Sequence, residues 1–258
     1  LNTVLMTPER TREAIADGAF LLSPYGAAAR TLSNIHNDFL TPLDIYEAAG
    51  DGVTSASAAI NEALSKGPPV LLPDTHNFRI TDPIIVGAGQ KLYSNGPGAA
   101  LYGPPGATTI KLRSGGFLQG FRLVKNPATA APLTHIEHDV SAGELVGGLL
   151  DSLQFEDGSF AVYTYGYNYR ARGLKIRNCN AIGVANPFFF EHLSDAELDG
   201  ITVSGASGAN ILFKGGKRSR ISRYDLTGGT TGITALGGVT VTGNGAISLD
   251  IGRGVIRS

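Results

Sequence analysis

The stretch GDGVTSASAAINEALSKGPPVLLP, residues 50–73, predicts one short helix in a chain whose other signals favour strands. Thr54 or Ser55 can cap the helix N-terminus, and two prolines end it. Ile60 and Leu64 lie four residues apart and form an apolar stripe on one side. A helix of roughly three turns is marginal in water by itself. We therefore expect the stripe to cover another part of the molecule.

The composition favours an all-β fold with frequent tight turns. The chain has 258 residues, 35 of them glycine, and short aliphatic runs separated by Gly and Asn follow the helix. It has 21 basic and 22 acidic side chains, a net charge of −1, which argues against nucleic-acid binding by general electrostatics. No apolar run approaches the ~18 residues of a membrane span.

A repeat runs through the second half of the chain. Phe155, Ile176, Val203 and Leu226 follow one another at intervals of 21, 27 and 23 residues. Each has an apolar or aromatic residue two positions earlier and polar residues on both sides. Since side chains alternate across a strand, we expect these four residues to form one row in a shared interior.

A second series indicates another strand in each repeat. Short apolar runs begin at Val162, Ile182, Ile211, Ile233 and Ile247. Strands that recur once per repeat can pair in parallel with their counterparts one coil later, which predicts a solenoid of the parallel β-helix type. The helix would then cap the first coil. No comparable helix follows the last repeat, so either another chain supplies that cap or the sequence is truncated at its C-terminus.

One segment near the start of the solenoid region carries a family likeness. Residues 50–86 resemble the opening segment of the pectate-lyase-like superfamily, in which a GDGVT turn precedes a capping helix, a V-x-L-P strand and a Y-x-I strand. Here Phe78 replaces the usual Tyr, and Ser55 and Ala56 replace acidic residues. The resemblance implies an all-β, right-handed parallel β-helix with an N-terminal capping helix over residues 46–258.

The resemblance also implies a function. Similar proteins include secreted polysaccharide lyases and hydrolases, and bacteriophage tailspikes that bind or cut bacterial surface glycans as homotrimers. It implies a tailspike-like protein that recognises, and as one option depolymerises, a bacterial surface polysaccharide, on a virion tail or in secreted form and without a cofactor. The alternatives are a non-catalytic virion or adhesin module and a secreted polysaccharide lyase or epimerase. Residues 1–45 would attach to a baseplate or tail protein, or extend along the solenoid.

The segment ANPFFFEHLSDAE, residues 185–197, is the longest predicted connection between strands. Loops that leave a regular scaffold often carry function. A carboxylate beside aromatic rings can act as a general acid, which makes Glu191, His192 and Asp195 the candidate catalytic residues. In the alternative, the phenylalanines fill the interior and the acidic residues solvate a turn.

Four tyrosines at alternate positions are candidates for substrate binding: Tyr163, Tyr165, Tyr167 and Tyr169. Flat rings can stack on sugar faces while their hydroxyls meet sugar hydroxyls. The alternative is an aromatic ladder that stabilises coil stacking, or a subunit interface.

A basic segment, KGGKRSRISR at residues 214–223, suggests an acidic polysaccharide as ligand, with Lys214, Arg218 and Arg220 as binding residues. The alternative is that these cations pair with neighbouring aspartates. We also expect an outward charge ladder of Asp151, Arg172 and Asp199, and a second contact of Glu156 with Arg177.

Pairs of acidic residues two positions apart could also serve glycoside hydrolysis: Glu137 with Asp139, Asp195 with Glu197, and Glu197 with Asp199. His135, Glu137 and Asp139 form an incomplete set of metal ligands, and we expect no metal site.

Overall fold

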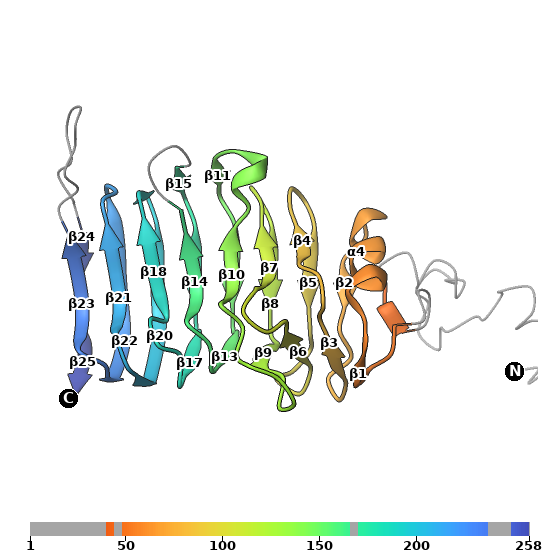
Figure 1. Cartoon of the computed structure of the whole chain (residues 1–258). Coiled ribbons are helices and arrows are strands. Elements are labelled where there is room, and N and C mark those ends of the chain that lie inside the picture. Colours follow the sequence, from red (N-terminus) through yellow and green to blue (C-terminus); the bar gives the residue numbers. More distant parts are fainter. Residues whose placement is uncertain (1–39, 44–47, 166–169, 237–248, 258) are drawn as a thin grey trace, which may run out of the picture. The chain divides into compact units, whose positions relative to one another are not determined.

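The computed structural model describes residues 40–43, 48–165, 170–236 and 249–257. From residue 41 onward these belong to one compact unit, residues 41–258. It is a parallel β-helix of about seven coils, as the repeat predicted (Figure 1). Among the described residues, no helix has the length and hydropathy needed to cross a bilayer. The predicted appendage, residues 1–45, lies almost entirely outside the described residues.

Three faces build each coil, and a strand of each face pairs with its counterpart in the next coil. The first face consists of β2 (Val70–Leu71), β5 (Lys91–Tyr93), β8 (Phe117–Gln119), β12 (Leu149–Asp151), β16 (Lys175–Arg177), the first parts of β20 (Glu197–Ala206) and β22 (Ser219–Gly228), and β24 (Leu249–Ile251). The second face consists of β1 (Asp51–Ser55), β3 (Asn77–Arg79), β6 (Ala100–Gly103), β9 (Arg122–Lys125), β13 (Gln154–Glu156), β17 (Asn180–Ile182), the remainders of β20 and β22, and β25 (Gly254–Arg257). Because β20 and β22 run through both faces, the two form one 15-stranded sheet.

The third face is a separate seven-stranded sheet whose strands follow one another along the stack in chain order (Figure 1). They are β4 (Ile84–Val86), β7 (Thr108–Leu112), β10 (Thr134–His138), β14 (Phe160–Thr164), β18 (Phe188–Glu191), β21 (Ala209–Lys214) and β23 (Thr231–Leu236). Between the third and first faces lie a short helix, η1 (Val140–Ala142), and a three-stranded sheet of β11 (Leu145–Val146), β15 (Ala171–Arg172) and β19 (Leu193–Ser194).

The interior is filled by apolar side chains from all three faces, and strands of the third face such as β7 and β18 each bury two of them. On the first face, Leu118, Leu150, Ile176 and Leu198 lie next to one another in a continuous buried row. Rows of this kind exclude water along the whole stack, and each fully buried aliphatic side chain contributes about 1.5–3 kcal/mol. The coils are therefore held together mainly by their shared core.

One predicted interior row was wrong in one member. Phe155, Val203 and Leu226 do lie in a single buried row on the second face, but the residue of that row in the intervening coil is Ala181. Ile176 is equally buried but belongs to the first face. Strands of both faces have the same pattern of one apolar residue between two outward ones, so the sequence pattern does not distinguish them.

The second predicted series contained the same kind of error. Val162 and Ile211 lie in the interior row of the third face, with Phe188 between them. Ile182 lies instead on the second face and is 40% exposed. Ile247 lies outside the described residues.

The helix predicted from the opening stretch is α4 (Ser57–Ser65), and it packs against β2 and β4 at one end of the stack (Figure 1). Ile60 and Leu64 are buried, as the apolar stripe predicted. The predicted capping residues were wrong: the N-cap is Ala56, with no side-chain hydrogen bond. Thr54 and Ser55 belong to β1, which ends before the helix begins, and the Thr54 hydroxyl donates a hydrogen bond to Asp51 at 3.0 Å.

Candidate functional site

Alternation along the third face turns a set of aromatic side chains outward. In β14, Val162 and Thr164 are buried, so Tyr163 between them faces out. In β18, Phe188 and Phe190 are buried and Phe189 faces out beside Tyr163. We call the half-buried rings of Phe160, Tyr163, Tyr165 and Phe189 the aromatic patch.

The rings of the aromatic patch contact one another within and between coils. The rings of Tyr163 and Phe189 are stacked, with centroids 5.2 Å apart and an interplanar angle of 26°. Phe160 lies 5.1 Å from Tyr163 and 5.5 Å from Phe189, and Tyr165 meets Tyr163 edge to face at 4.7 Å. Such cross-strand pairs stabilise the stacking of coils. Because all four rings stay partly exposed, they also form a continuous aromatic surface.

Charged groups border the aromatic patch on both sides. Glu137, next to Tyr163 in register, accepts a hydrogen bond from the Thr108 hydroxyl at 2.6 Å. On the other side Glu191 lies 3.6 Å from the ammonium of Lys214, which also lies 4.7 Å from the centroid of the Phe189 ring. The surface therefore combines flat rings with hydrogen-bond acceptors and a positioned ammonium.

The field at the tyrosines disfavours negative charge. Burial, with smaller contributions from the charges of Glu191 and Glu137, raises the pKa of Tyr163 to about 12. Burial also raises the pKa of Tyr165, and the charge of Glu137 adds to the effect. Both phenols thus remain protonated hydrogen-bond donors at neutral pH.

The prediction that residues 185–197 form a protruding loop was wrong. Phe188–Glu191 is strand β18, which pairs in parallel with β14 and β21, and Leu193–Ser194 is strand β19, which pairs in parallel with β15. Phe188 and Phe190 fill the interior, because three consecutive phenylalanines in a strand necessarily alternate. Only Phe189 remains to form an outer surface.

The candidate catalytic residues lie in different places. Glu191 is on the outward side of the third face, 3.6 Å from the ammonium of Lys214. Its charge acts on both Tyr163 and Tyr165. His192 follows in the turn to β19, with φ 50°, and its backbone N–H donates to Lys214 O at 3.0 Å. Asp195 lies beyond β19 and accepts two hydrogen bonds from Arg218, at 2.6 and 2.9 Å, which lower its pKa.

The basic segment is largely engaged in ion pairs, as the alternative interpretation predicted. Arg218 is held by Asp195, and Arg223 donates to Asp199 at 2.7 Å. The Arg223 hydrogen bond is the main reason that the pKa of Asp199 falls to about 2. Arg220 lies on the first face beside Glu197 in register. Tyr167 and Tyr169 lie outside the described residues.

The predicted charge ladder exists with one different member, since Arg177 takes the place predicted for Arg172. Asp151, Arg177 and Asp199 occupy one outward row of the first face. Arg172 instead lies in β15, 3.5 Å from Glu144. The predicted contact of Glu156 with Arg177 was also wrong.

Glu156 lies beside Ile182 and pairs with Arg122 at 3.2 Å. The error has the same cause as the misplacement of Ile176, because Glu156 of the second face was aligned with Arg177 of the first face. The ladder itself remains an outward structural feature of the stack.

The acidic pairs are also committed to structural contacts. Asp139 is buried against Arg113 at 2.6 Å, and Glu197 lies 2.9 Å from Arg177. Burial opposes the charged form of Asp139, but hydrogen bonds from Ser141 and Arg113 outweigh it and lower the pKa. His135 and His138, on the same strand as Glu137, are buried and form hydrogen bonds with backbone carbonyls. Within the described ranges, no group of three or more His, Cys, Asp or Glu side chains is arranged to hold a metal ion.

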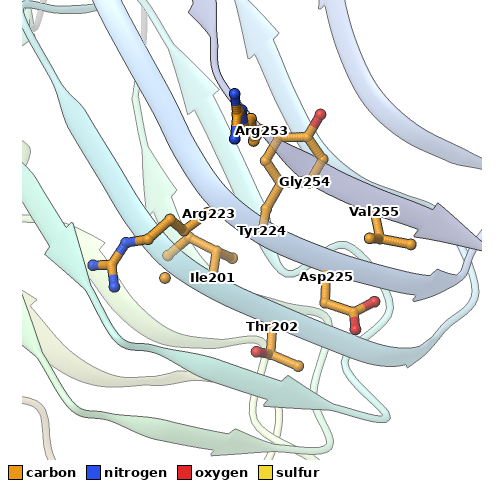
Figure 2. A pocket seen from close by; sticks show the side chains of 9 residues that line it. Ile201, Thr202, Arg223, Tyr224, Asp225, Arg253, Gly254 and Val255 are labelled. Carbon is orange, nitrogen blue, oxygen red and sulfur yellow. The ribbon is translucent and has the colours of Figure 1, made fainter.

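A separate groove of about 480 Å³ lies where the first and second faces meet at the last coils (Figure 2). Tyr224, Asp225 and Arg253 line it, and Gly254 leaves room for the Tyr224 ring. Asp225 pairs with Arg257 at 3.1 Å, and Arg223 with Asp199. Because its carboxylate and one of its guanidinium groups are already engaged, the groove offers a ligand less than the aromatic patch does.

The sequence interpretation missed two members of the aromatic patch, Phe160 and Phe189. A usable signal was present, because Phe189 follows Tyr163 by 26 residues, and Asn180 follows its register partner Gln154 by the same interval. Aligning the tyrosine row with the three phenylalanines would have placed them side by side.

The chain was compared with known proteins. No protein-family model matches the sequence, and no curated protein matches it. Among solved structures, the Dettilon tailspike protein resembles it with a TM-score of 0.50 and 17% identity, over 91% of this chain and 52% of that one. This chain has the β-helix fold of a tailspike protein. It spans about half the length of the tailspike structure.

Two further solved structures show weaker likeness. The catalytic unit of an α-1,3-glucanase from Streptomyces thermodiastaticus has a TM-score of 0.45 and 13% identity, over 81% of this chain and 43% of that one. The Streptococcus pneumoniae surface protein and adhesin PfbA has a TM-score of 0.44 and 12% identity, over 73% of this chain and 67% of that one.

Proposed function

We propose that the third face binds a polysaccharide of a bacterial surface, in the manner of a tailspike. The observation that carries the proposal is the aromatic patch, in which partly exposed rings lie between Glu137 on one side and Glu191 with Lys214 on the other. Rings of this kind stack on sugar rings, and the neighbouring carboxylates accept hydrogen bonds from sugar hydroxyls. The fold shared with the Dettilon tailspike protein supports the proposal.

The shape of the scaffold suits a long ligand. Adjacent coils are about 4.8 Å apart, and the outward side chains of the third face repeat at that spacing along the stack. An extended polymer can therefore contact several coils at once. The aromatic patch lies on two adjacent coils, which is where we expect the tightest contacts.

Affinity electrophoresis through gels that contain bacterial capsular polysaccharides or lipopolysaccharide tests the proposal. The wild-type protein should be retarded, and Tyr165→Ala should lose about tenfold or more in affinity, because each aromatic contact is worth about 1–2 kcal/mol. Tyr165 is suited to this test because its ring lies at the margin of the patch.

The matched control is Tyr102→Ala, which removes a partly exposed tyrosine from the second face. It should bind like the wild type. Equal losses in both variants, or no retardation in any gel, would refute the assignment to the third face.

A tailspike-like role also includes a homotrimer and attachment to a virion, and both are part of this proposal. Sedimentation equilibrium tests the trimer. Deletion of residues 1–45 should abolish attachment to a particle and leave polysaccharide binding intact. A deletion variant that still attaches would favour the alternative in which this segment extends along the solenoid.

Hydrolysis of the bound polysaccharide is a second candidate function. Glu137 and Glu191 lie on opposite sides of the strand that carries Tyr163, and the charges of both raise the pKa of that tyrosine. One coil lies between them, so their backbones are two coil spacings, about 10 Å, apart along the stack, and Glu191 lies two positions further along its strand. Glutamate side chains can shorten that gap toward the ~6.5–9.5 Å typical of inverting glycosidases.

An assay for new reducing ends tests hydrolysis. Glu191→Gln should lower the rate at least ~100-fold, whereas Asp195→Asn should change it less than ~2-fold, since Asp195 is held by Arg218. The opposite ranking would move the chemistry to Asp195. Binding with no reducing ends in the wild type would leave recognition as the function.

A further inference from the structure

The charges of the third face define the kind of polysaccharide that it can take. Its strands carry four residues charged at neutral pH, and these are Lys111, Glu137, Glu191 and Lys214. The two positive and two negative side chains cancel, and each cation has a carboxylate next to it. Lys111 is the register neighbour of Glu137, and Lys214 lies 3.6 Å from Glu191.

We infer that the bound polysaccharide is uncharged, a polymer of neutral hexoses or N-acetylated sugars rather than of uronic or sialic acids. This inference rests on the proposed function. Binding an acidic sugar requires a cation that can face its carboxylate, ideally the two-pronged donor set of an arginine. The ammonium of Lys214 is instead committed to Glu191 and to the Phe189 ring.

The arginines that could recognise carboxylates are engaged elsewhere. Arg218 makes two hydrogen bonds to Asp195, and Arg113 makes one to the buried Asp139 at 2.6 Å. Arg223 donates a hydrogen bond to Asp199 at 2.7 Å. The basic segment that suggested an acidic ligand is thus used to hold neighbouring coils together.

The raised pKa values of Tyr163 and Tyr165 indicate how this surface would act on a bound negative charge. At the Tyr163 hydroxyl, burial and the charges of Glu191 and Glu137 disfavour a negative charge. The carboxylate of a uronic acid stacked on this ring would meet the same two carboxylates. Sugar hydroxyls meet no such repulsion, because they can donate hydrogen bonds to Glu137 and Glu191.

The test is an array of neutral and acidic capsular polysaccharides and O-antigens, probed with the full chain at low and high salt. We expect the bound members to be neutral, with affinity changing less than about twofold between ~50 and ~500 mM salt, since no net charge is paired. Binding to acidic members that weakens strongly with salt would overturn the inference and leave the proposed function standing. No binding to any member would overturn the proposed function itself.

A charge variant sharpens the test. Glu191→Gln removes one carboxylate and releases Lys214, so affinity for alginate or polygalacturonate should rise about tenfold as repulsion becomes attraction. The matched control is Glu197→Gln, which breaks an ion pair with Arg177 on the first face. The control should leave uronate binding unchanged. An equal rise in both variants, or none in Glu191→Gln, would contradict the inference.

Discussion

The outward sides of the third face and of the 15-stranded sheet are built on the same coils but carry different chemistry. On the 15-stranded sheet, oppositely charged side chains bridge neighbouring coils, as in Arg122–Glu156, Arg223–Asp199 and Arg257–Asp225. On the third face, aromatic rings contact one another between coils, and their edges and faces remain partly exposed.

This difference indicates which surface is available to a ligand. An ion pair satisfies both of its members, so a ladder of such pairs has little left to offer and adds at most ~1 kcal/mol per exposed pair. Aromatic rings in contact still present apolar surface to water, which a sugar ring can cover. The third face is therefore the surface suited to binding, and four experiments test this contrast.

The largest effect is expected in the interior that both surfaces share. Phe188 is fully buried on the third face, and its ring meets Phe155 of the second face edge to face, with centroids 6.2 Å apart. Phe188→Ala should lower the free energy of unfolding by about 3–5 kcal/mol in chemical denaturation.

The double variant with Phe155→Ala checks that the core is common to both faces. The two losses should deviate from additivity by at least ~0.5 kcal/mol, because the rings touch. Strict additivity would indicate separate cores. Phe117→Ala, on the outward side of the first face, is the control and should cost much less.

The second effect is a dependence of stability on pH, in which a buried histidine and a surface carboxylate act over different pH ranges. Burial lowers the pKa of His135 from 6.5 to about 4. The unfolded chain therefore binds a proton between these values that the folded chain does not. Stability should be complete above about pH 6.5 and should fall, by on the order of 3 kcal/mol, as the pH drops toward 4.

The measurement is the unfolding midpoint against pH, with His135→Gln as the comparison. The variant should have a flatter profile between pH 6.5 and 4, and burial of His138 leaves some residual slope. Asp199 acts in another window, because its pKa of about 2 means that its contribution is lost only as the pH falls from 3.8 toward 2. An unchanged slope in His135→Gln would contradict the assignment.

The third effect compares one contact between coils from each surface. Phe189→Ala removes a ring stacked on Tyr163 and should cost about 1–2 kcal/mol. Arg177→Ala removes an ion pair with Glu197 and should cost less than ~1 kcal/mol. Thermal unfolding of the two variants ranks them, and the reverse order would mean that the charge ladder is the stronger of the two.

The smallest effect is expected at Arg218. Its side chain is 70% exposed although it makes two hydrogen bonds to Asp195. Arg218→Ala should change the thermal midpoint least of the variants, because an exposed ion pair is screened by water, and should leave polysaccharide binding unchanged. A clear loss of binding would show that the basic segment contacts the ligand after all.

Most errors in the sequence interpretation came from alignment between coils, whereas the helix N-cap and the loop predicted at residues 185–197 were errors of local structure. The strand at Lys175–Arg177 was predicted where it occurs, but Ile176 was assigned to the wrong interior row. The interval between equivalent residues of the second face varies from 32, between Leu123 and Phe155, to 22, between Ala181 and Val203. With intervals this variable, a strand of one face can be mistaken for a strand of the next.

The candidate site was predictable only in part for the same reason. The tyrosine alternation marked Tyr163 and Tyr165, and Glu191 and Lys214 were each noted separately. That Glu191 and Lys214 are neighbours, and that Phe189 lies beside Tyr163, depends on the pairing of β18 with β14 and β21. Residues 185–197 were predicted to be a loop because they form the longest connection between the predicted strands, and this hid the strand that contains the three phenylalanines.

The sequence by itself determined that the strands are short, that they recur and stack in parallel, and that a helix with Ile60 and Leu64 on one side covers apolar surface. These features follow from local rules, since alternation within a strand and spacing along a helix need no knowledge of the partner. Only the tertiary structure decided which strands of neighbouring coils pair and in which register, and with that the composition of the aromatic patch and the pairing of the charges. Register is set by the backbone hydrogen bonds of all three faces at once, which no single stretch of sequence contains.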